Sequence, residues 1–221
     1  MTGLQYRAVL FDLDGTLLYT LDDIARAANR VLEKRGFPPH PVEAYRLFIG
    51  HGPRTLIQRV LPEKERRPET VDACTGEFLE AYDADWPGTT KPFDGIPDLL
   101  RFLEDRGLRL AVLSNKAHMF TVKGVERFFP GCDFEVVLGY QDGLPLKPDP
   151  AGALRIAESM DLSPEHFMYV GDSPTDMKTA RGAGMYPVGV LWGLRGESEL
   201  VAAGAELTVS HPSQITALFN F

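Results

Sequence analysis

Near its start the sequence reads Tyr6-Arg7-Ala8-Val9-Leu10-Phe11-Asp12-Leu13-Asp14-Gly15-Thr16. The apolar run that ends at Asp12 is typical of a buried strand whose carboxyl end meets solvent. Side-chain alternation places the carboxylates of Asp12 and Asp14 on one side, and Gly15 lets the chain turn away. Two acids so close repel each other unless a cation or a shared proton lies between them. A simple polar turn uses the same residue types, so this stretch predicts a strand end and only suggests a site.

The following segment, from about residue 20 to about residue 86, has helical patterns and no strand pattern. Apolar residues recur on one helical face from Leu21 to Leu32, and Gly36 supplies the stop. Thr20 and Asp23 are predicted to form the capping box of this helix. Further helices are predicted over residues 41–49, 53–61 and 69–86.

Strands and helices alternate after the turn-rich segment at residues 87–92. Strands are predicted over residues 108–113, 134–138, 167–170 and 187–191, with helices between them. This pattern predicts an α/β fold with a doubly wound, parallel-sheet, Rossmann-like core. We assign residues 1–18 and 90–221 to the core and residues 19–89 to an inserted, all-helical cap domain. Such an insert can close over an active site.

Composition narrows the classes of function. The chain has 221 residues, 44 % of them hydrophobic, which is enough for a full core. It has neither a signal-peptide pattern nor an apolar run long enough for a membrane helix, so we expect a cytoplasmic protein without a membrane partner. The formal net charge of −8 argues against a nucleic-acid partner. Cys74 and Cys132 are expected to be reduced thiols. No pattern indicates an oligomeric state.

Three more polar clusters follow predicted strands. Ser114-Asn115-Lys116 offers donors for an anion, although a helix cap is the more common explanation for this tripeptide taken alone. Lys147 lies in a rigid turn between prolines, and Asp172 should project from the end of a central strand. Asp176 either caps the next helix with Ser173 or supports a metal. All these clusters should converge on one crevice, because the carboxyl ends of parallel strands share one edge.

In order and spacing, these segments resemble the four motifs of the haloacid dehalogenase superfamily, whose members also insert a helical cap after the first motif. The resemblance implies that Asp12 is a nucleophile that forms an aspartyl-phosphate and that Asp14 is the general acid and base. It also implies that Ser114, Asn115 and Lys147 bind the phosphoryl group of a small phosphorylated metabolite. Mg²⁺ is the implied cofactor, with Asp12, Asp14 (through its main-chain carbonyl) and Asp172 as ligands, and oxygen ligands of this kind suit it.

Further segments resemble the phosphoglycolate phosphatases and their close relatives: residues 48–54, Gly139-Tyr140 and residues 144–150. The resemblance implies that His51 and Arg54 of the cap reach the substrate carboxylate, although a surface turn explains both. Tyr19-Thr20 departs from the Asp-Ser pair that is frequent in that family. Asp14 disfavours a dehalogenase, because dehalogenases of the superfamily lack that acid. A phosphonatase is disfavoured because the early cap offers only Lys34, at a helix end, for its Schiff base.

Several functions therefore stay open beside phosphoglycolate hydrolysis. A sugar-phosphate mutase similar to β-phosphoglucomutase shares the core and the cap. A pyrophosphatase or a nucleotidase would differ in cap side chains that the sequence does not place. A non-catalytic binding module belongs to a different class, and the presence of all the acids that the chemistry needs counts against it.

Overall fold

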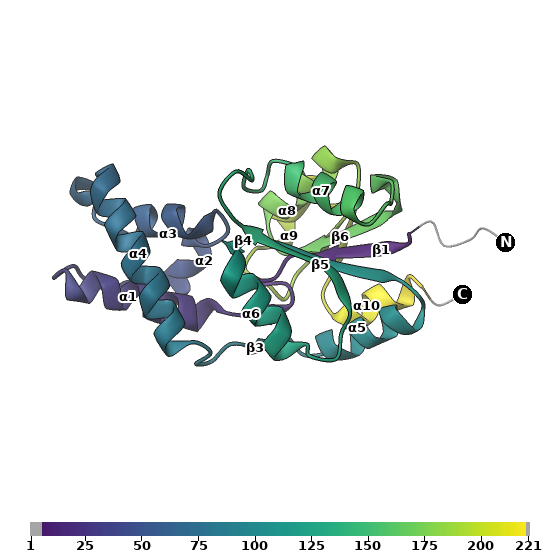
Figure 1. The fold of residues 1–221 in the computed structure, drawn as a ribbon, viewed down its shortest axis with the longest axis horizontal. Helices are drawn as coiled ribbons and strands as arrows, with labels where there is room; N and C mark the ends of the chain where they lie inside the picture. The colour runs from purple at the N-terminus through teal and green to yellow at the C-terminus, as the bar shows by residue number, and fades with distance from the viewer. Residues whose placement is uncertain (1–5, 220–221) are drawn as a thin grey trace.

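The computed structural model describes residues 6–219, which contain a six-stranded parallel sheet (Figure 1). The strand order is β5-β4-β1-β6-β7-β8. Their bounds are β1 Ala8–Phe11, β4 Arg109–Ala117, β5 Phe134–Tyr140, β6 Phe167–Gly171, β7 Tyr186–Val190 and β8 Leu207–Val209. Leu10 of the fully buried β1 pairs with Ala111 on one side and Tyr169 on the other. The predicted parallel α/β core is confirmed.

Helices cover both faces of the sheet, because successive residues of each strand point to opposite sides. Val9 and Phe11 pack in the cluster that includes α5 and α10, whereas Ala8 and Leu10 pack against α7 and α8. Figure 1 shows α7 and α8 above the sheet and α5, α6 and α10 below it. The bounds are α5 Ile96–Asp105, α6 His118–Phe128, α7 Ala151–Ser159, α8 Pro174–Ala183, α9 Glu197–Ala202 and α10 Pro212–Ala217.

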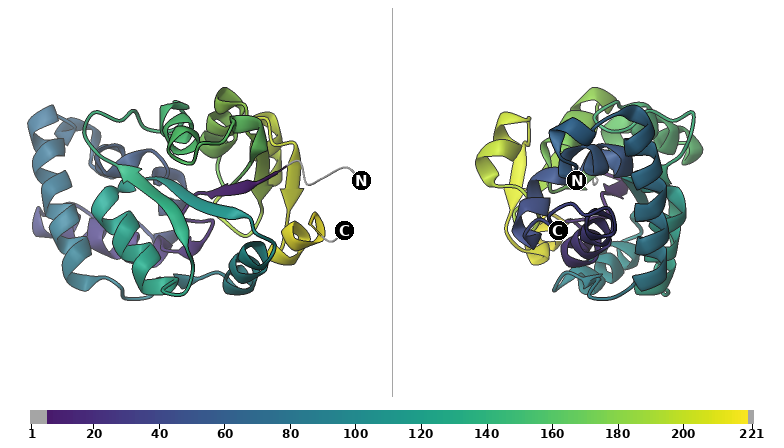
Figure 2. Two further views of the ribbon diagram at one scale, coloured as in Figure 1. Left: turned by 45° about the vertical axis from the view of Figure 1, so that its right-hand side comes forward. Right: turned by 90° about the vertical axis from the view of Figure 1, so that its left-hand side faces the viewer.

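The inserted segment forms a helical layer beyond the carboxyl ends of the strands (Figure 2). It contains α1 Leu21–Lys34, α2 Tyr45–Phe48, α3 Gly52–Val60 and α4 Pro68–Asp85, with 3-10 turns at Val42–Ala44 and Glu63–Glu65. Apolar side chains of α1, α3 and α4 form a hydrophobic cluster with the buried Tyr45, and Phe120 of the core joins it. The prediction of helices without strands across residues 20–86 therefore holds.

Two chain crossings join the inserted helices to the core, and they are tied together. Strand β2 (Leu18–Tyr19) pairs antiparallel with β3 (Lys91–Pro92), a ribbon that the sequence did not reveal. The predicted capping box of α1 is wrong, because Thr20 makes no side-chain cap bond. Asp23 instead accepts main-chain N–H bonds from residues 88–90 and hydroxyl bonds from Thr89 and Thr90. Its carboxylate thus holds the returning chain against the first cap helix.

The remaining differences from the predicted elements are small. Strand β8 and helices α9 and α10 were not predicted, and β4 runs four residues past its predicted end, as far as Ala117. Residues 1–5 and 220–221 of the predicted core lie outside the described residues. Across residues 6–219, no helix combines the length and the apolar character that crossing a membrane requires.

Candidate active site

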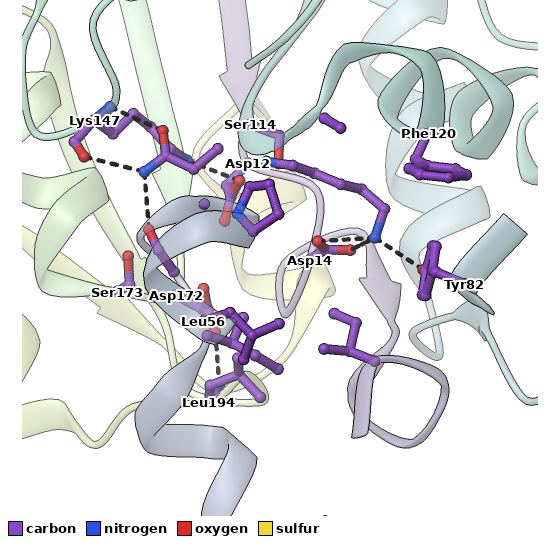
Figure 3. A pocket seen from close by; sticks show the side chains of 18 of the residues that line it. Asp12, Asp14, Leu56, Tyr82, Ser114, Phe120, Lys147, Asp172, Ser173 and Leu194 are labelled. Atoms are coloured by element: carbon purple, nitrogen blue, oxygen red, sulfur yellow. Dashed lines mark hydrogen bonds and ion pairs between the residues drawn. The ribbon is translucent and has the colours of Figure 1, made fainter. Parts of the chain in front are cut away.

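Segments that lie far apart in the sequence meet in one cavity at the carboxyl ends of the central strands (Figure 3). Asp12 directly follows β1, and Asp172 directly follows β6. Ser114 and Asn115 belong to β4, and Lys147 arrives from the loop between β5 and α7. These residues all line the cavity. The structure therefore brings together the core residues that the sequence singled out.

Lys147 is a buried cation at the floor of this cavity. Its Nζ donates to Asp12 Oδ1 at 2.8 Å, to Asp176 Oδ1 at 2.6 Å and to the carbonyl of Leu113 at 3.1 Å. Burial disfavours the ammonium, but the Asp12 and Asp176 carboxylates outweigh it and raise the pKa of Lys147 well above its ordinary value. Lys147 is therefore a fixed positive charge beside Asp12.

Asp12, Asp172 and Asp176 form a buried acidic cluster in which each offers an oxygen within 4.8 Å of the others. Burial, and then repulsion from Asp176, raises the pKa of Asp12 to about 7. Burial and the charge of Asp12 also raise the pKa of Asp172 well above its ordinary value. Because Lys147 alone does not offset three carboxylates, this cluster favours a further cation or bound protons.

Asp176 joins the first turn of α8 to this cluster. Its Oδ2 accepts from the Ser173 main-chain N–H at 3.0 Å and from the Ser173 hydroxyl at 2.6 Å, and this completes the predicted capping box. Its Oδ1 accepts from Lys147 and, at 3.3 Å, from the Tyr169 hydroxyl. Both oxygens are engaged, so the side chain caps a helix and also positions Lys147.

Two glycines leave room for the Asp172 carboxylate. Gly15 has φ +89°, and a Cβ there would lie 2.2 Å from Asp172 Oδ2. A Cβ at Gly193 would lie 2.3 Å from Asp172 Cβ. The main-chain N–H of the next residue, Leu194, donates to Asp172 Oδ2 at 2.6 Å. The turn at residues 193–194 thus holds one oxygen of Asp172 in place.

Asp14 lines the same cavity and is held by Lys116, a residue whose place in the site was not predicted from the sequence. Lys116 Nζ donates to the two carboxylate oxygens of Asp14 at 3.0 and 3.1 Å and to the Tyr82 hydroxyl at 2.9 Å (Figure 3). Burial opposes the charge of Lys116, but Asp14 and then Tyr82 raise its pKa above the ordinary value. The sequence signal for a role of Lys116 in the site was its position, two residues after Ser114 and at the end of a strand.

Ser114 and Asn115 play different parts at the end of β4. The Ser114 hydroxyl oxygen accepts from the Lys116 main-chain N–H at 3.2 Å, and none of residues 6–219 accepts its own hydrogen, which can therefore be donated to a ligand. The Asn115 amide donates to the carbonyls of Gly50 and Lys147 and accepts from the Lys147 N–H. The Asn115 side chain thus ties the Lys147 loop to the cap, and its phosphate-binding role stays a prediction.

The side of the cavity that faces the cap is mostly apolar. Helices α1, α3 and α4 supply side chains to it, and the core adds Ala117 and Phe120. The apolar residues contributed by the cap are Ile24, Ile49, Pro53, Leu56, Phe78 and Leu79. Tyr82 is the point where this roof carries a hydroxyl next to the polar floor (Figure 3). The cavity thus combines a charged floor with an apolar roof.

His51 and Arg54 are not among the residues that line this cavity, although Gly50, Gly52 and Pro53 are. The Arg54 guanidinium pairs with Asp72 of α4 at 2.7 Å, and its side chain is 54 % exposed. Burial and nearby cations lower the pKa of His51. The structure therefore gives no support to the prediction that these two side chains contact the substrate.

Two arginines connect the cap to the core at another side of the cavity. Arg46 of α2 donates to the carbonyl of Gly193 at 2.8 Å. Arg195 of the core donates back to the cap carbonyls of Arg46 and Ile49. This exchange, which we call the arginine latch, involves the turn that also binds Asp172. Contact between cap and core is thus coupled to the acidic cluster.

Comparison with known proteins agrees with this geometry. The model of the family of haloacid dehalogenase-like hydrolases matches residues 9–190. A phosphoglycolate phosphatase of Pseudomonas putida is 34 % identical over 86 % of this chain and 71 % of its own length. One from Aquifex aeolicus is 31 % identical over 97 % of each chain.

Solved structures point the same way. A Lactobacillus delbrueckii protein, provisionally described as a phosphoglycolate phosphatase, has a crystal structure that superposes with a TM-score of 0.89 at 30 % identity. That superposition covers 96 % of this chain and 97 % of the other. The likeness thus extends through both the sheet and the inserted helices.

Proposed function

The chain belongs to the family of haloacid dehalogenase-like hydrolases, and we propose that it is a Mg²⁺-dependent phosphatase that hydrolyses a small phosphomonoester. The observation that carries the proposal is the position of Asp12. Its carboxylate lies at the floor of a cavity, 2.8 Å from the Lys147 ammonium, and Asp14 lines the same cavity. A carboxylate nucleophile, a fixed cation and a second acid are the groups that phosphoryl transfer through an enzyme intermediate requires.

The donor set fits a hard divalent cation. Asp12 and Asp172 offer buried carboxylate oxygens that repel each other, and burial followed by this repulsion raises the pKa of both, which a bound cation would offset. We propose that Asp12, Asp172 and the main-chain carbonyl of Asp14 hold Mg²⁺, which prefers such oxygen ligands. Bound there, the ion would neutralise charge on the phosphoryl group. Asp176 would support the site through Lys147.

We assign the nucleophilic step to Asp12. One of its carboxylate oxygens attacks phosphorus and forms an aspartyl-phosphate, while the bond from phosphorus to the leaving oxygen breaks. Asp14 gives its proton to that leaving oxygen, which departs as an alcohol. Lys147 and the Ser114 hydroxyl, with its free hydrogen, would bind the phosphoryl oxygens. Water then attacks the same phosphorus and gives a proton back to Asp14, so that inorganic phosphate leaves and Asp12 is restored.

The leading candidate substrate is 2-phosphoglycolate, because relatives more than 30 % identical over most of their length carry that activity in their names. A sugar-phosphate mutase and a pyrophosphatase would use the same floor with other leaving groups, and we rank them below it. A non-catalytic module would leave the Asp12, Asp14 and Lys147 arrangement without a purpose.

The test is inorganic phosphate release from 2-phosphoglycolate, pyrophosphate and several sugar phosphates, with Mg²⁺ and with a chelator. We expect fast release from 2-phosphoglycolate that the chelator abolishes and excess Mg²⁺ restores. Preferred release from another compound would keep the reaction class and overturn the substrate. An isomerised sugar phosphate as product would indicate a mutase. Absence of release from every compound, despite stabilisation by ligands, would favour a binding module.

A further inference from the structure

Lys116 is a buried cation that lies between the charged floor and the apolar roof of the cavity. Its side chain is 8 % exposed, and its Nζ lies 4.5 Å from the centre of the Tyr82 ring as well as 2.9 Å from the Tyr82 hydroxyl. Lys116 thus reaches from β4 in the core to α4 in the cap. A buried ammonium is costly unless anions surround it, so its position in this cavity calls for a function.

The other cations that line the cavity are committed elsewhere. Lys147 donates to Asp12, Asp176 and the Leu113 carbonyl on the floor, where the phosphoryl group would bind. Lys116 instead directs two of its three N–H groups at the single carboxylate of Asp14, so one of them can pass to a substrate oxygen while the other keeps Asp14 in place. Arg195 donates to the main-chain carbonyls of Arg46 and Ile49 in the cap. Among the cavity-lining residues that the structure describes, Lys116 is the cation that stands beside the acid predicted to protonate the leaving oxygen.

Covalent geometry then places part of the leaving group next to Lys116. If Asp14 donates to the leaving oxygen, that oxygen lies within hydrogen-bond distance of Asp14, and Lys116 binds the same carboxylate. A carboxylate on the carbon attached to the leaving oxygen is only two covalent bonds away from that oxygen. The roof residues that the structure describes are apolar apart from Tyr82, and Arg195, which lines the same cavity, is engaged in the arginine latch.

We infer that Lys116 determines specificity by binding a carboxylate adjacent to the leaving oxygen, with the Tyr82 hydroxyl orienting its ammonium. The cavity would then prefer phosphorylated 2-hydroxycarboxylates, of which 2-phosphoglycolate is the smallest, to phosphomonoesters of simple alcohols. The inference rests on the proposed phosphatase function and adds to it the residue that selects the substrate.

The test compares 2-phosphoglycolate with ethyl phosphate, which has a methyl group in place of the carboxylate. Lys116→Met keeps most of the side-chain length and removes the charge. We expect it to lower the ratio of kcat/KM for 2-phosphoglycolate to kcat/KM for ethyl phosphate by about 30-fold, mainly through a higher KM for 2-phosphoglycolate. A change of this size corresponds to the loss of one charged hydrogen bond. Lys116→Arg should restore part of the ratio. Lys123→Met, which removes an exposed lysine that pairs with Asp83 on the cap, is the matched control and should leave the ratio unchanged.

A parallel measurement does not depend on turnover. In the Asp12→Asn protein, calorimetry should show that 2-phosphoglycolate binds more tightly than ethyl phosphate and that adding Lys116→Met removes the difference. Equal losses for both substrates in the Lys116→Met enzyme would overturn the inference and leave Lys116 only as a support for Asp14. Loss of the ratio in Arg195→Met, with the ratio kept in Lys116→Met, would also overturn it. If the wild type releases no phosphate, the phosphatase proposal fails, and the calorimetric comparison still decides the role of Lys116.

Discussion

At the scale of single residues, the site depends on how buried charges are matched. Asp12 is 7 % exposed and Asp172 is 2 % exposed, so neither is stabilised by bulk water. Lys147 supplies one positive charge for three carboxylates. A residue that contributes to this cluster therefore affects both activity and stability, and the two effects can have opposite signs.

Asp12→Asn is the substitution that separates the effect on activity from the effect on stability. It keeps the shape of the side chain and removes both the nucleophile and one of three mutually repelling carboxylates. We expect phosphate release to fall by at least about 1,000-fold, as for loss of other covalent nucleophiles. The melting temperature of the metal-free protein should stay the same or rise. Thermal unfolding in chelator, alongside the phosphate assay, checks both effects, and a variant that keeps near-native turnover would contradict the assignment.

The pKa of Asp12 also predicts how Mg²⁺ binding depends on pH. Because burial raises that pKa to about 7, the metal-free site is mostly protonated at pH 6 and mostly charged at pH 8. Protons and Mg²⁺ compete for this carboxylate and for that of Asp172, whose pKa is also raised, so apparent Mg²⁺ affinity should rise at least about tenfold from pH 6 to pH 8. Calorimetric titration at both pH values measures it. An affinity independent of pH would contradict the raised pKa.

The raised pKa of Asp12 also predicts how the stability of the metal-free protein changes with pH. The folded protein holds a proton on Asp12 that the unfolded chain loses near pH 4, so this group makes the metal-free fold less stable as pH rises from about 4 to 7. Mg²⁺ should reverse that trend, because it replaces the proton. Melting temperatures with and without the ion, measured across this range, should therefore diverge as pH increases.

The sequence predicted the floor of the site better than the contacts around it. Asp12, Asp14 and Asp172 stand at strand ends, where topology alone determines that they meet. The partner of Asp14 was not predictable, because Lys116 belongs to another strand and its direction depends on how β4 extends past its predicted end. The contacts of Asn115 with Gly50 likewise depend on how closely the cap approaches the core.

At the scale of elements, the two crossings between cap and core depend on Asp23 of α1. Its carboxylate is 3 % exposed, and five hydrogen bonds connect it to residues 88–90. Burial opposes ionisation, but the bonds from Thr90 and Thr89 outweigh it and hold the pKa of Asp23 well below its ordinary value. The charged carboxylate is therefore what ties β3 to the start of the cap.

Asp23→Asn should destabilise the fold by about 2 kcal/mol at pH 7, which lowers the melting temperature by roughly 4–8 °C for a chain of this size. Because the folded-state pKa is depressed, the contribution of Asp23 is complete above the unfolded value of 3.8 and is lost as pH falls through the folded value. The difference between variant and wild type should therefore shrink below pH 4. A stability difference between wild type and variant that stays constant down to pH 3 would show that the negative charge of Asp23 is not what stabilises the fold.

The arginine latch is the second element-scale contact, and it should affect substrate binding. Removing the Arg46 guanidinium with Arg46→Ala leaves the Gly193 carbonyl without its cap donor. We expect KM to rise about tenfold with a smaller change in kcat, since one charged hydrogen bond between cap and core is lost. The concentration of Mg²⁺ needed for half activation should rise as well, because the same turn binds Asp172.

Arg30→Ala is the matched control for the latch, because Arg30 pairs with Asp85 on the exposed side of the cap, away from the cavity. It should change neither KM nor the Mg²⁺ requirement. If Arg46→Ala and Arg30→Ala had the same KM and the same Mg²⁺ requirement, the arginine latch would have no specific role in binding the substrate or the ion.

Sequence periodicity located most helices to within a few residues but failed at the connections. A long amphipathic segment such as α1 carries its own signal. The ribbon of β2 and β3 has two residues in each strand, which is too short for any pattern, and its partners lie more than seventy residues apart. Asp23 was predicted to cap the start of its own helix. Its carboxylate instead accepts hydrogen bonds from the distant residues 88–90, which offer more donors.

At the scale of the whole molecule, the groups that would react with the phosphoryl group lie apart from the groups that would select the substrate. Two hydrophobic clusters flank the sheet and make it rigid, and a third fills the inserted helices. We propose that residues 19–89 move as one unit on the core, since their apolar side chains pack mainly with one another. Strand ends then fix the reacting groups, while the apolar roof and Lys116 set the leaving group.

The central claim is that Asp12 receives the phosphoryl group, and mass spectrometry of the trapped enzyme tests it most directly. Asp14→Asn should slow the hydrolysis of the intermediate, because the water then lacks its base. Because this variant also lacks the acid that protonates the leaving oxygen, the phosphoryl donor is p-nitrophenyl phosphate, whose leaving group departs without a proton. After acid quenching with this donor and Mg²⁺, the peptide that contains Asp12 should carry the added mass of one phosphoryl group, and the same sample from Asp12→Asn should not. Phosphate release from an enzyme that never carries this mass on Asp12, or that carries it on Ser114 instead, would contradict the account.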